Sequence, residues 1–253
     1  MINSPVVHVL LVATVLFIFF NRSESNFKPE YDWLQMVVSV YNENLEWLDL
    51  EPYKSFDKIV YHKGEKAVPE CKIDHCKIVK LPNVGRCDHT YLKHIIENYD
   101  NLKPVTLFVT GSCRSLIEKR ELLDKVLIKM LETKTTIMYV TRGPPDPDFQ
   151  IDYHKSGDIN NRQRDIKSEL QKSPIRPLKR WFEHNFPGEI IKYVHYKGTF
   201  AVSKEHIHNR TKEFYQKLIK YLEEDSNPEV GHYMERSWAT IFQPLPEQCV
   251  YYN

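Results

Sequence analysis

Apolar residues along the chain occur in two patterns, short unbroken runs and stripes at helical spacing. The short runs are rich in β-branched residues and predict buried strands at residues 35–41, 57–62, 77–81, 105–110 and 137–140. Apolar positions recur at helical spacing in residues 83–99, 117–132 and 211–223. Strand and helix therefore alternate at least twice, which predicts an α/β fold with a mainly parallel sheet and helices on its faces.

The remaining segments have weaker patterns. Residues 45–53 predict a short helix that stops near Pro52, and residues 193–203 are strand-like about Gly198. A last helix is expected to open at Gly231. Residues 142–177 are rich in proline and charge, so we expect a long loop over the edge of the sheet.

The N-terminal region contains one long apolar run, residues 5–20, in which only His8 could carry a charge. This run is a little shorter than the ~20 residues that span a bilayer and longer than the ~7–15 residues of most signal-peptide cores. The sequence shows no basic segment before the run and no clear cleavage site after it. We therefore expect an uncleaved signal-anchor helix in residues 1–22 rather than a cleaved signal peptide. A short stem in residues 23–33 and one domain in residues 34–253 would follow.

Two features disagree about the side of the membrane on which the domain lies. Arg22 and Lys28 follow the apolar run and favour a cytoplasmic domain. The acceptor sequons Asn21-Arg22-Ser23 and Asn209-Arg210-Thr211 would be used only in the lumen. We expect a single-pass membrane protein of the secretory pathway (ER or Golgi) with a luminal domain, and its orientation stays open.

The number of cysteines and the net charge limit which disulfides, metal sites and partners can be expected. Five cysteines cannot all pair with one another, but Cys71 and Cys76 would close a short loop in an oxidising compartment. We do not expect these two residues to bind zinc, because no second pair of ligands lies at the spacing of a zinc site. Lys+Arg 35 against Asp+Glu 34 gives a net charge of +1, so no nucleic-acid partner is expected.

The stretch Asn83–Tyr99 brings a glycine, an arginine and a helix start together. Gly85 can adopt a backbone conformation closed to other residues, and Asp88 is a candidate helix cap. The free N–H groups of a first helical turn, beside the cation of Arg86, suit an anionic group such as a diphosphate. The alternative is an ordinary loop with a solvated arginine.

Two further sites carry candidate chemistry. The first strand ends at Tyr41-Asn42-Glu43, and ligands of open α/β sheets bind at such carboxyl ends. Lys63 follows the second strand as a cation at the tip of a turn. Near the C-terminus, Glu235 lies beside Arg236 among apolar residues, where it could form a salt bridge or act as a base.

Three of these segments, in this order, carry a family resemblance. They are Tyr41-Asn42-Glu43, then Asn83-x-Gly85-Arg86-x-x-x-Thr90-Tyr91-Leu92, then Phe200-Ala201-Val202-Ser203 together with Glu235-Arg236-x-Trp238. Together they resemble a family of uncharacterised fungal, algal and large-DNA-virus proteins, a domain of unknown function that is itself similar to GT-A glycosyltransferases. The resemblance covers most of the chain, from about Leu34 to Phe242.

The resemblance implies a single GT-A-like (Rossmann-like) domain that transfers a sugar from a nucleotide-sugar donor to a hydroxyl of a glycan or glycoprotein. Glu235 would be the general base of an inverting reaction, and Arg86 would stabilise the leaving diphosphate. On the acceptor side it implies Tyr91, Phe200 and Trp238. The implied donor-binding residues are Tyr41, Asn42, Glu43, Lys63, Asn83, Gly85, Arg86 and Arg236.

The chain departs from this pattern where a metal motif is expected. The strand 105–110 should end in D-x-D, but the sequence is Thr110-Gly111-Ser112, and Cys87 stands where an acid would follow Arg86. Basic side chains can replace a metal because both neutralise charge on the leaving group. We therefore expect no required cofactor, with a divalent metal (Mn or Mg) at Asp146 and Asp148 as the weaker alternative. The available cations are Lys63, Arg86, Arg114 and Arg236.

Two other classes of function compete with the transferase. The first is a membrane-anchored module of the same fold that has lost catalysis and binds glycans or a protein partner. The second is a nuclease or phosphatase built on the aspartates and histidines of residues 146–154, which lie among prolines rather than on a rigid strand. The relative positions of Arg86 and Glu235 distinguish the transferase, because a catalyst must hold both at one site.

Overall fold

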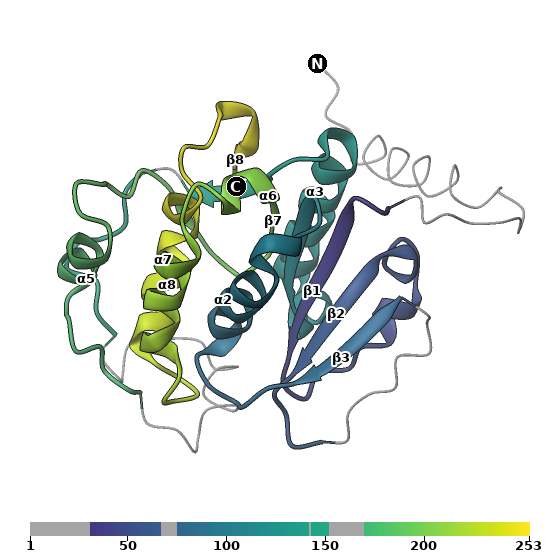
Figure 1. Cartoon of the computed structure of the whole chain (residues 1–253), viewed down its shortest axis with the longest axis horizontal. Helices are drawn as coiled ribbons and strands as arrows, with labels where there is room; N and C mark the ends of the chain where they lie inside the picture. Colours follow the sequence, from purple (N-terminus) through teal and green to yellow (C-terminus); the bar gives the residue numbers. More distant parts are fainter. Residues whose placement is uncertain (1–30, 67–74, 142, 152–169) are drawn as a thin grey trace, which may run out of the picture. The chain divides into compact units, whose positions relative to one another are not determined.

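A five-stranded sheet of order β3-β2-β1-β4-β7 lies at the centre of the computed structural model, which describes residues 31–66, 75–141, 143–151 and 170–253 (Figure 1). Its parallel strands are β1 (Leu34–Val40), β2 (Asp57–His62), β3 (Cys76–Lys80) and β4 (Val105–Thr110). β1 and β4 are apolar and almost wholly buried, as expected of strands covered on both faces.

The expectation of a mainly parallel sheet is corrected by β7 (Phe200–Ser203), which pairs antiparallel with β4 and makes the sheet mixed. β7 is entered from a tight turn at Lys197–Gly198, where both residues have positive φ, and not from a crossover helix. β7 does not follow β4 through a single crossover helix, which is the connection that a parallel neighbour would need. The strand-like pattern of residues 193–203 carried no information about this direction.

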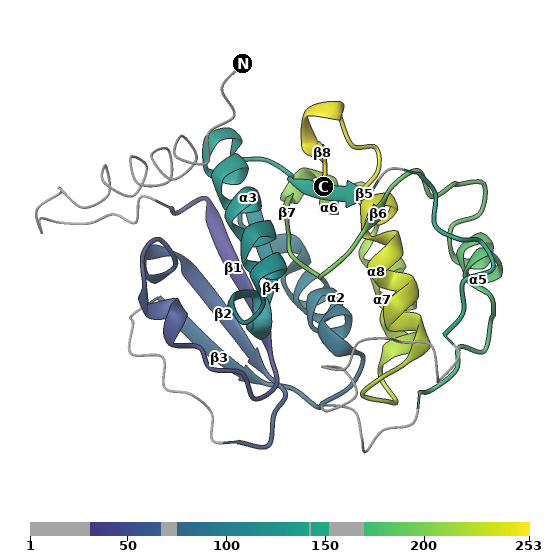
Figure 2. The same cartoon turned by 180° about the vertical axis from the view of Figure 1, so that it is seen from behind.

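Helices cover both faces of the sheet. Figures 1 and 2, drawn from opposite sides, show α2 (Arg86–Asn98) and α3 (Ile117–Thr133) on opposite faces. One apolar cluster joins α2 to α7 (Lys212–Ile219) and α8 (Glu229–Ile241), and a second cluster joins α3 to the other face. The sheet thus separates two cores, and α2 and α8 share one of them.

A second, three-stranded sheet lies beyond β7, with the order β6-β5-β8. Its strands are β5 (Met138–Thr141), β6 (Val194–His195) and β8 (Val250–Tyr252). The strand predicted at residues 137–140 therefore exists but belongs to this sheet, which meets the first through a bridge between Ile137 and Ala201. β8 was not predicted, because it is too short for an alternation to be visible.

One helical prediction needs correction, and one further helix was not predicted. The single helix expected at residues 45–53 is two 3-10 helices, η1 (Glu46–Asp49) and η2 (Tyr53–Ser55), which Pro52 separates. Within the predicted loop 142–177 the described residues are irregular, but α5 (Leu178–Asn185) follows it directly after Pro177. The remaining short helices are η3 (Tyr99–Asn101), η4 (Gly111–Arg114), α6 (Lys204–Ile207), η5 (Lys220–Leu222) and η6 (Glu247–Cys249).

The signal-anchor predicted in residues 1–22 lies outside the described residues, as does the stem up to residue 30. Of the helices in residues 31–253 that the structure describes, none is long and apolar enough to cross a bilayer. Cys76 is disulfide-bonded, whereas Cys87, Cys113 and Cys249 are free. The predicted partner of Cys76 is Cys71, which lies outside the described part of the chain.

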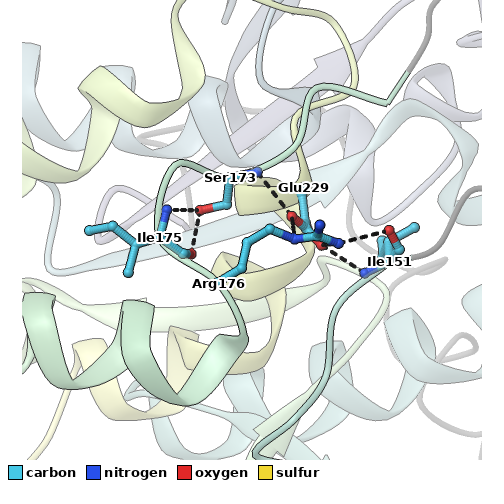
Figure 3. Close-up of polar contacts among 5 residues, drawn as sticks. All are labelled: Ile151, Ser173, Ile175, Arg176 and Glu229. Carbon is cyan, nitrogen blue, oxygen red and sulfur yellow. Dashed lines mark hydrogen bonds and ion pairs between the residues drawn. The ribbon is translucent and has the colours of Figure 1, made fainter.

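A buried carboxylate fixes the irregular segments beside α5 to the first turn of α8 (Figure 3). Glu229 has no exposed surface, and its Oε1 accepts a hydrogen bond of 2.7 Å from the backbone N–H of Ile151. Its Oε2 accepts one of 2.9 Å from the N–H of Ser173, and Arg176 Nε lies 2.8 Å from the same oxygen. One acidic side chain therefore holds two segments that are separated in sequence.

Replacing Glu229 by glutamine should lower the free energy of unfolding by about 2–4 kcal/mol, because the amide nitrogen faces donors and Arg176 loses its partner. Urea unfolding followed by tryptophan fluorescence measures this loss. The control is Glu132→Gln, which removes an exposed ion pair with Lys129 and should change stability by less than about 0.5 kcal/mol. Similar losses in both variants would contradict the anchoring role of Glu229.

Candidate functional site

The carboxyl ends of β1 and β4 form the switch point of the sheet. From β1 the chain continues to β2 and β3 on one side, while β4 lies on the other side of β1. In open α/β sheets ligands bind in the crevice outside such a switch point. The residues that follow the two strands are Tyr41, Asn42 and Glu43 after β1, and Gly111 and Ser112 after β4.

Glu43 occupies the space between these two strand ends. Its Oε2 accepts hydrogen bonds from the N–H groups of Tyr41 at 2.7 Å and Asn42 at 3.1 Å. A Cβ atom added to Gly111 would lie 3.2 Å from the same oxygen and 2.9 Å from Cγ2 of Val40. Glu43 thus shapes the backbone of the β1 loop, and Gly111 lets β4 end against it.

The turn before α2 is held in a conformation that few residues adopt. Gly85 has φ +60°, and the next residue, Arg86, has φ +52°. The N–H of Gly85 donates a hydrogen bond of 2.7 Å to the carbonyl of Asp225, and a Cβ at position 85 would lie 2.5 Å from the carbonyl oxygen of Leu222. Gly85 is therefore needed for both its φ and its lack of a side chain, as its sequence context predicted.

Lys63 stabilises this turn. Its buried ammonium group donates hydrogen bonds to the carbonyl oxygens of Val84 and Arg86, and burial lowers the pKa of Lys63 to about 8. The predicted role of Lys63 was contact with the donor diphosphate, but its ammonium group is directed to the backbone beside Arg86. Asn83, the first residue of the predicted motif, is exposed.

Arg86 lies against α8. Its Nη1 donates a hydrogen bond of 3.0 Å to Oδ1 of Asn227, and its Cδ would be 3.1 Å from a Cβ atom added to Gly231. Glu235 follows Gly231 by four residues, so both lie on the same face of α8. Of the two residues predicted to be catalytic, Arg86 thus packs its aliphatic chain one helical turn before Glu235, and its guanidinium group is bonded to Asn227, before the start of α8.

Glu235 is oriented by the turn that precedes β7. Its Oε1 accepts a hydrogen bond of 2.7 Å from the backbone N–H of Lys197, which has φ +73°. A Cβ atom on the next residue, Gly198, would lie 3.1 Å from Sγ of Cys87 and 3.4 Å from Cγ2 of Thr110. The turn thus connects α8, the start of α2 and the end of β4, and it links Glu235 to the switch point.

Asp88 is a second carboxyl group at this junction, and the sequence suggested only a capping role for it. It is buried, and its Oδ1 accepts a hydrogen bond of 2.7 Å from Nε1 of Trp238. Burial raises the pKa of Asp88 to about 7, and the hydrogen bond from Trp238 acts against this shift. The negative charge of Glu235 also raises this pKa, and the positive charge of Arg86 lowers it.

Arg236 faces a different set of groups. Its guanidinium carbon lies 3.6 Å from the ring centroid of Phe149 and 5.1 Å from that of Tyr196, and its Nη1 donates to the carbonyl of His232 at 2.9 Å. Burial lowers the pKa of Arg236. Cation–π contacts and a carbonyl therefore engage the side chain that was predicted to bind the donor.

The three aromatic residues predicted on the acceptor side lie in the core. Tyr91, Phe200 and Trp238 have no exposed surface, and their ring centroids are 5.4–6.1 Å apart. The hydroxyl of Tyr91 donates a hydrogen bond of 2.6 Å to the carbonyl of Gly198. In these positions the rings support the site from within the protein.

The residues proposed as a weaker metal site form a turn. Asp146 Oδ1 accepts a hydrogen bond of 3.0 Å from the N–H of Asp148, as aspartates in turns commonly do. In the ranges 31–66, 75–141, 143–151 and 170–253, no group of three or more His, Cys, Asp or Glu residues is arranged to hold a metal ion. Arg114, another predicted cation, lies 3.3 Å from Asp124 on α3.

Lys119 is a cation at the end of β4 that was not predicted from the sequence. Its Nζ donates a hydrogen bond of 2.9 Å to the hydroxyl of Ser112, whose Oγ lies 3.3 Å from that of Thr110. Lys119 therefore stands where the D-x-D motif was expected. Its place in the first turn of α3, directly after the β4 loop, was the available signal, because the start of that helix must lie near the end of β4.

Comparison with known proteins gives one match. A family model described as "Protein of unknown function (DUF3431)" matches residues 36–253. The matched range includes every residue of the candidate site. Neither the curated proteins nor the solved structures give a significant match.

Substitution of Gly85 by alanine should lower the free energy of unfolding by about 2–4 kcal/mol, because left-handed strain and a steric clash add. Gly188 is the matched control, since its φ is +79° but no atom lies within 4 Å of an added Cβ. Gly188→Ala should cost only the strain, about 1–2 kcal/mol. Urea unfolding of both variants tests the difference, and equal losses would show that the contact with Leu222 is unimportant.

Burial of Asp88 should make the stability of the protein depend on pH. The folded-state pKa of Asp88, about 7, exceeds its ordinary value of 3.8, so the folded state binds this proton more tightly than the unfolded state does. The resulting stabilisation is complete below about pH 4 and is lost as the pH rises through 7. Asp88→Asn removes the titration but keeps an acceptor for Trp238.

The stability of Asp88→Asn relative to the wild type should therefore increase by on the order of 2 kcal/mol between pH 5 and pH 8. Urea unfolding at the two pH values measures this change. Asp100→Asn, at an exposed position, controls for a general effect of net charge. A relative stability of Asp88→Asn that does not change with pH would mean that Asp88 is ionised throughout.

Proposed function

The chain belongs to DUF3431, a family of proteins of unknown function, and we propose that it is a glycosyltransferase that uses a nucleotide-sugar donor. Glu235 is the general base in this proposal, and Arg86 stabilises the leaving diphosphate. The acceptor is a hydroxyl group of a glycan or glycoprotein. The observation that carries the proposal is the position of Arg86 against Gly231 of α8, one helical turn before Glu235, which the turn before β7 links to the end of β4.

Backbone strain at the same place supports a functional site. Three non-glycine residues in the described part of the chain have positive φ, namely Arg86, Lys134 and Lys197. Lys134 ends α3, where a left-handed residue is common. Lys197 donates a hydrogen bond to Glu235, and Arg86 lies against Gly231, one helical turn before Glu235. Such strain costs about 1–3 kcal/mol per residue and is concentrated at functional sites.

The strand order gives further support. The spatial order β3-β2-β1-β4 is that of a nucleotide-binding half of a doubly wound sheet. Such a half binds its ligand at the β1/β4 switch point. A GT-A-like donor site would have the nucleoside at Tyr41, Asn42 and Glu43. The diphosphate would then lie toward α2 and the β4 loop.

The proposed reaction is a single displacement with inversion. The acceptor oxygen forms a bond to the anomeric carbon while the bond from that carbon to the diphosphate oxygen breaks, and the electron pair leaves with the diphosphate. Glu235 takes the hydroxyl proton, which requires an ionised carboxylate within hydrogen-bond reach of the acceptor. The hydrogen bond from Lys197 leaves Oε2 of Glu235 for this contact.

Cations would replace a metal in this mechanism. Lys119, bonded to Ser112, stands where a D-x-D motif would hold a metal, and Arg86 lies at the start of α2. Both can neutralise charge that develops on the leaving group. No metal cofactor is required in this proposal.

The competing proposal is a binding module of the same fold. The observation that favours it is the direction of Lys63 and Arg236, whose cationic groups contact backbone carbonyls and aromatic rings. Fewer cations are then directed to a leaving group than a catalyst would use. A glycan or a protein would be the ligand of such a module.

A luminal location fits both proposals. Cys76 is disulfide-bonded, and disulfides persist in oxidising compartments such as the ER lumen. We propose that the N-terminal apolar run anchors the protein in the membrane of the secretory pathway.

Turnover of UDP- and GDP-sugars by the full chain, with and without EDTA, tests the transferase proposal. Glu235→Gln should lower kcat by about 10²- to 10⁴-fold and leave donor affinity unchanged, because it removes the base but little volume. Glu97→Gln is the control, since this glutamate is exposed on α2 and pairs with Lys93. Its rate should equal that of the wild type.

The outcomes separate the proposals. Turnover that survives EDTA supports the cationic mechanism, whereas turnover abolished by EDTA contradicts it. Unchanged turnover in Glu235→Gln would exclude Glu235 as the base. Binding of a glycan without turnover of any donor would favour the binding module.

A further inference from the structure

The turn Lys197–Gly198 is the most constrained backbone next to Glu235. Lys197 has φ +73°, a left-handed conformation that costs a non-glycine residue roughly 1–2 kcal/mol. Strain of this kind persists only where surrounding contacts determine the conformation. The contacts that determine it therefore also determine where the N–H of Lys197 points.

Two short hydrogen bonds fix the turn from opposite ends. The N–H of Lys197 donates to Oε1 of Glu235 at 2.7 Å, and the carbonyl of Gly198 accepts from the hydroxyl of Tyr91 at 2.6 Å. Tyr91 has no exposed surface, and its ring packs between those of Phe108 and Trp238, at centroid distances of 4.8 and 6.1 Å. The hydroxyl of Tyr91 is therefore held by a rigid ring.

The turn packs closely against α2 at Gly198. A Cβ atom on Gly198 would lie 3.1 Å from Sγ of Cys87 and 3.6 Å from the hydroxyl oxygen of Tyr91. Both of these atoms belong to α2, which also carries Arg86. α2 thus sets the position of the turn, and the turn sets that of the carboxylate on α8.

We propose that Tyr91 is a positioning residue that orients Glu235 through the Lys197–Gly198 turn. The link is the hydrogen bond from Tyr91 to Gly198, together with the one from Lys197 to Glu235. The importance of this orientation for catalysis rests on the proposed function, but the link itself does not. Tyr91 acts without touching a substrate, which agrees with its complete burial.

Tyr215 provides a matched control. It also has no exposed surface, and its hydroxyl donates a hydrogen bond of 2.7 Å to a backbone carbonyl, that of Ile207. This hydrogen bond joins α7 to the end of α6, away from the turn. Tyr91→Phe and Tyr215→Phe each remove one hydroxyl from a buried ring, so their global stabilities should fall by similar amounts.

Amide hydrogen exchange of Lys197, measured by NMR on the full chain, is the first readout. In Tyr91→Phe the Lys197 amide should exchange at least about tenfold faster than in Tyr215→Phe, since the turn loses one of its two restraints. Its amide proton resonance should also move upfield as the bond to the carboxylate lengthens. Exchange that rises equally in both variants would reflect global destabilisation and overturn the proposal.

Steady-state kinetics are the second readout, for a wild type that turns over a nucleotide-sugar. Tyr91→Phe should lower kcat by about tenfold with KM unchanged, and Tyr215→Phe should change kcat by less than about twofold. A change in KM alone would overturn the positioning role. If the wild type has no turnover, the transferase proposal fails, and the Lys197 amide still decides whether Tyr91 orients Glu235.

Discussion

The contact between the first turn of α2 and α8 is the constraint on which the candidate site depends. It consists of the hydrogen bond from Trp238 to Asp88 and of the close approach of Arg86 to Gly231. A Cβ atom at position 231 would lie 3.1 Å from Cδ of Arg86, so a larger residue there would displace the Arg86 side chain. Because Glu235 follows one turn later on α8, the same contact determines its distance from Arg86.

Two lysines near the site bind backbone carbonyls, Lys63 at a buried position and Lys80 at an exposed one. Lys63 bonds to the carbonyls of Val84 and Arg86, and Lys80 bonds to that of Gly64. A buried ammonium group needs acceptors, and for Lys63 the carbonyls of the turn before α2 supply them. These loops are therefore ordered before any ligand binds, which lowers the entropic cost of binding.

The spacing of apolar residues predicted where individual strands and helices lie along the chain. The limits of β2 and β4 agree with those predicted, and α3 extends one residue further. Strand direction and sheet membership have no local signal, so the antiparallel β7 and the second sheet could not be predicted. At the site, Gly85 and Arg86 were identifiable from their turn. The hydrogen bond of Tyr91 joins residues far apart in sequence and was not visible.

The aromatic residues that the family resemblance implied on the acceptor side belong to the core instead. Tyr91, Phe200 and Trp238 adjoin the motifs, and aromatic rings often stack on sugars, yet all three are buried. Each packs its ring in the core, while Tyr91 and Trp238 use their single donors on the Gly198 carbonyl and the Asp88 carboxyl. A buried ring with one donor fixes that donor in space, because few rotamers fit the core. Such residues therefore hold the backbone and carboxyl groups that a substrate would meet.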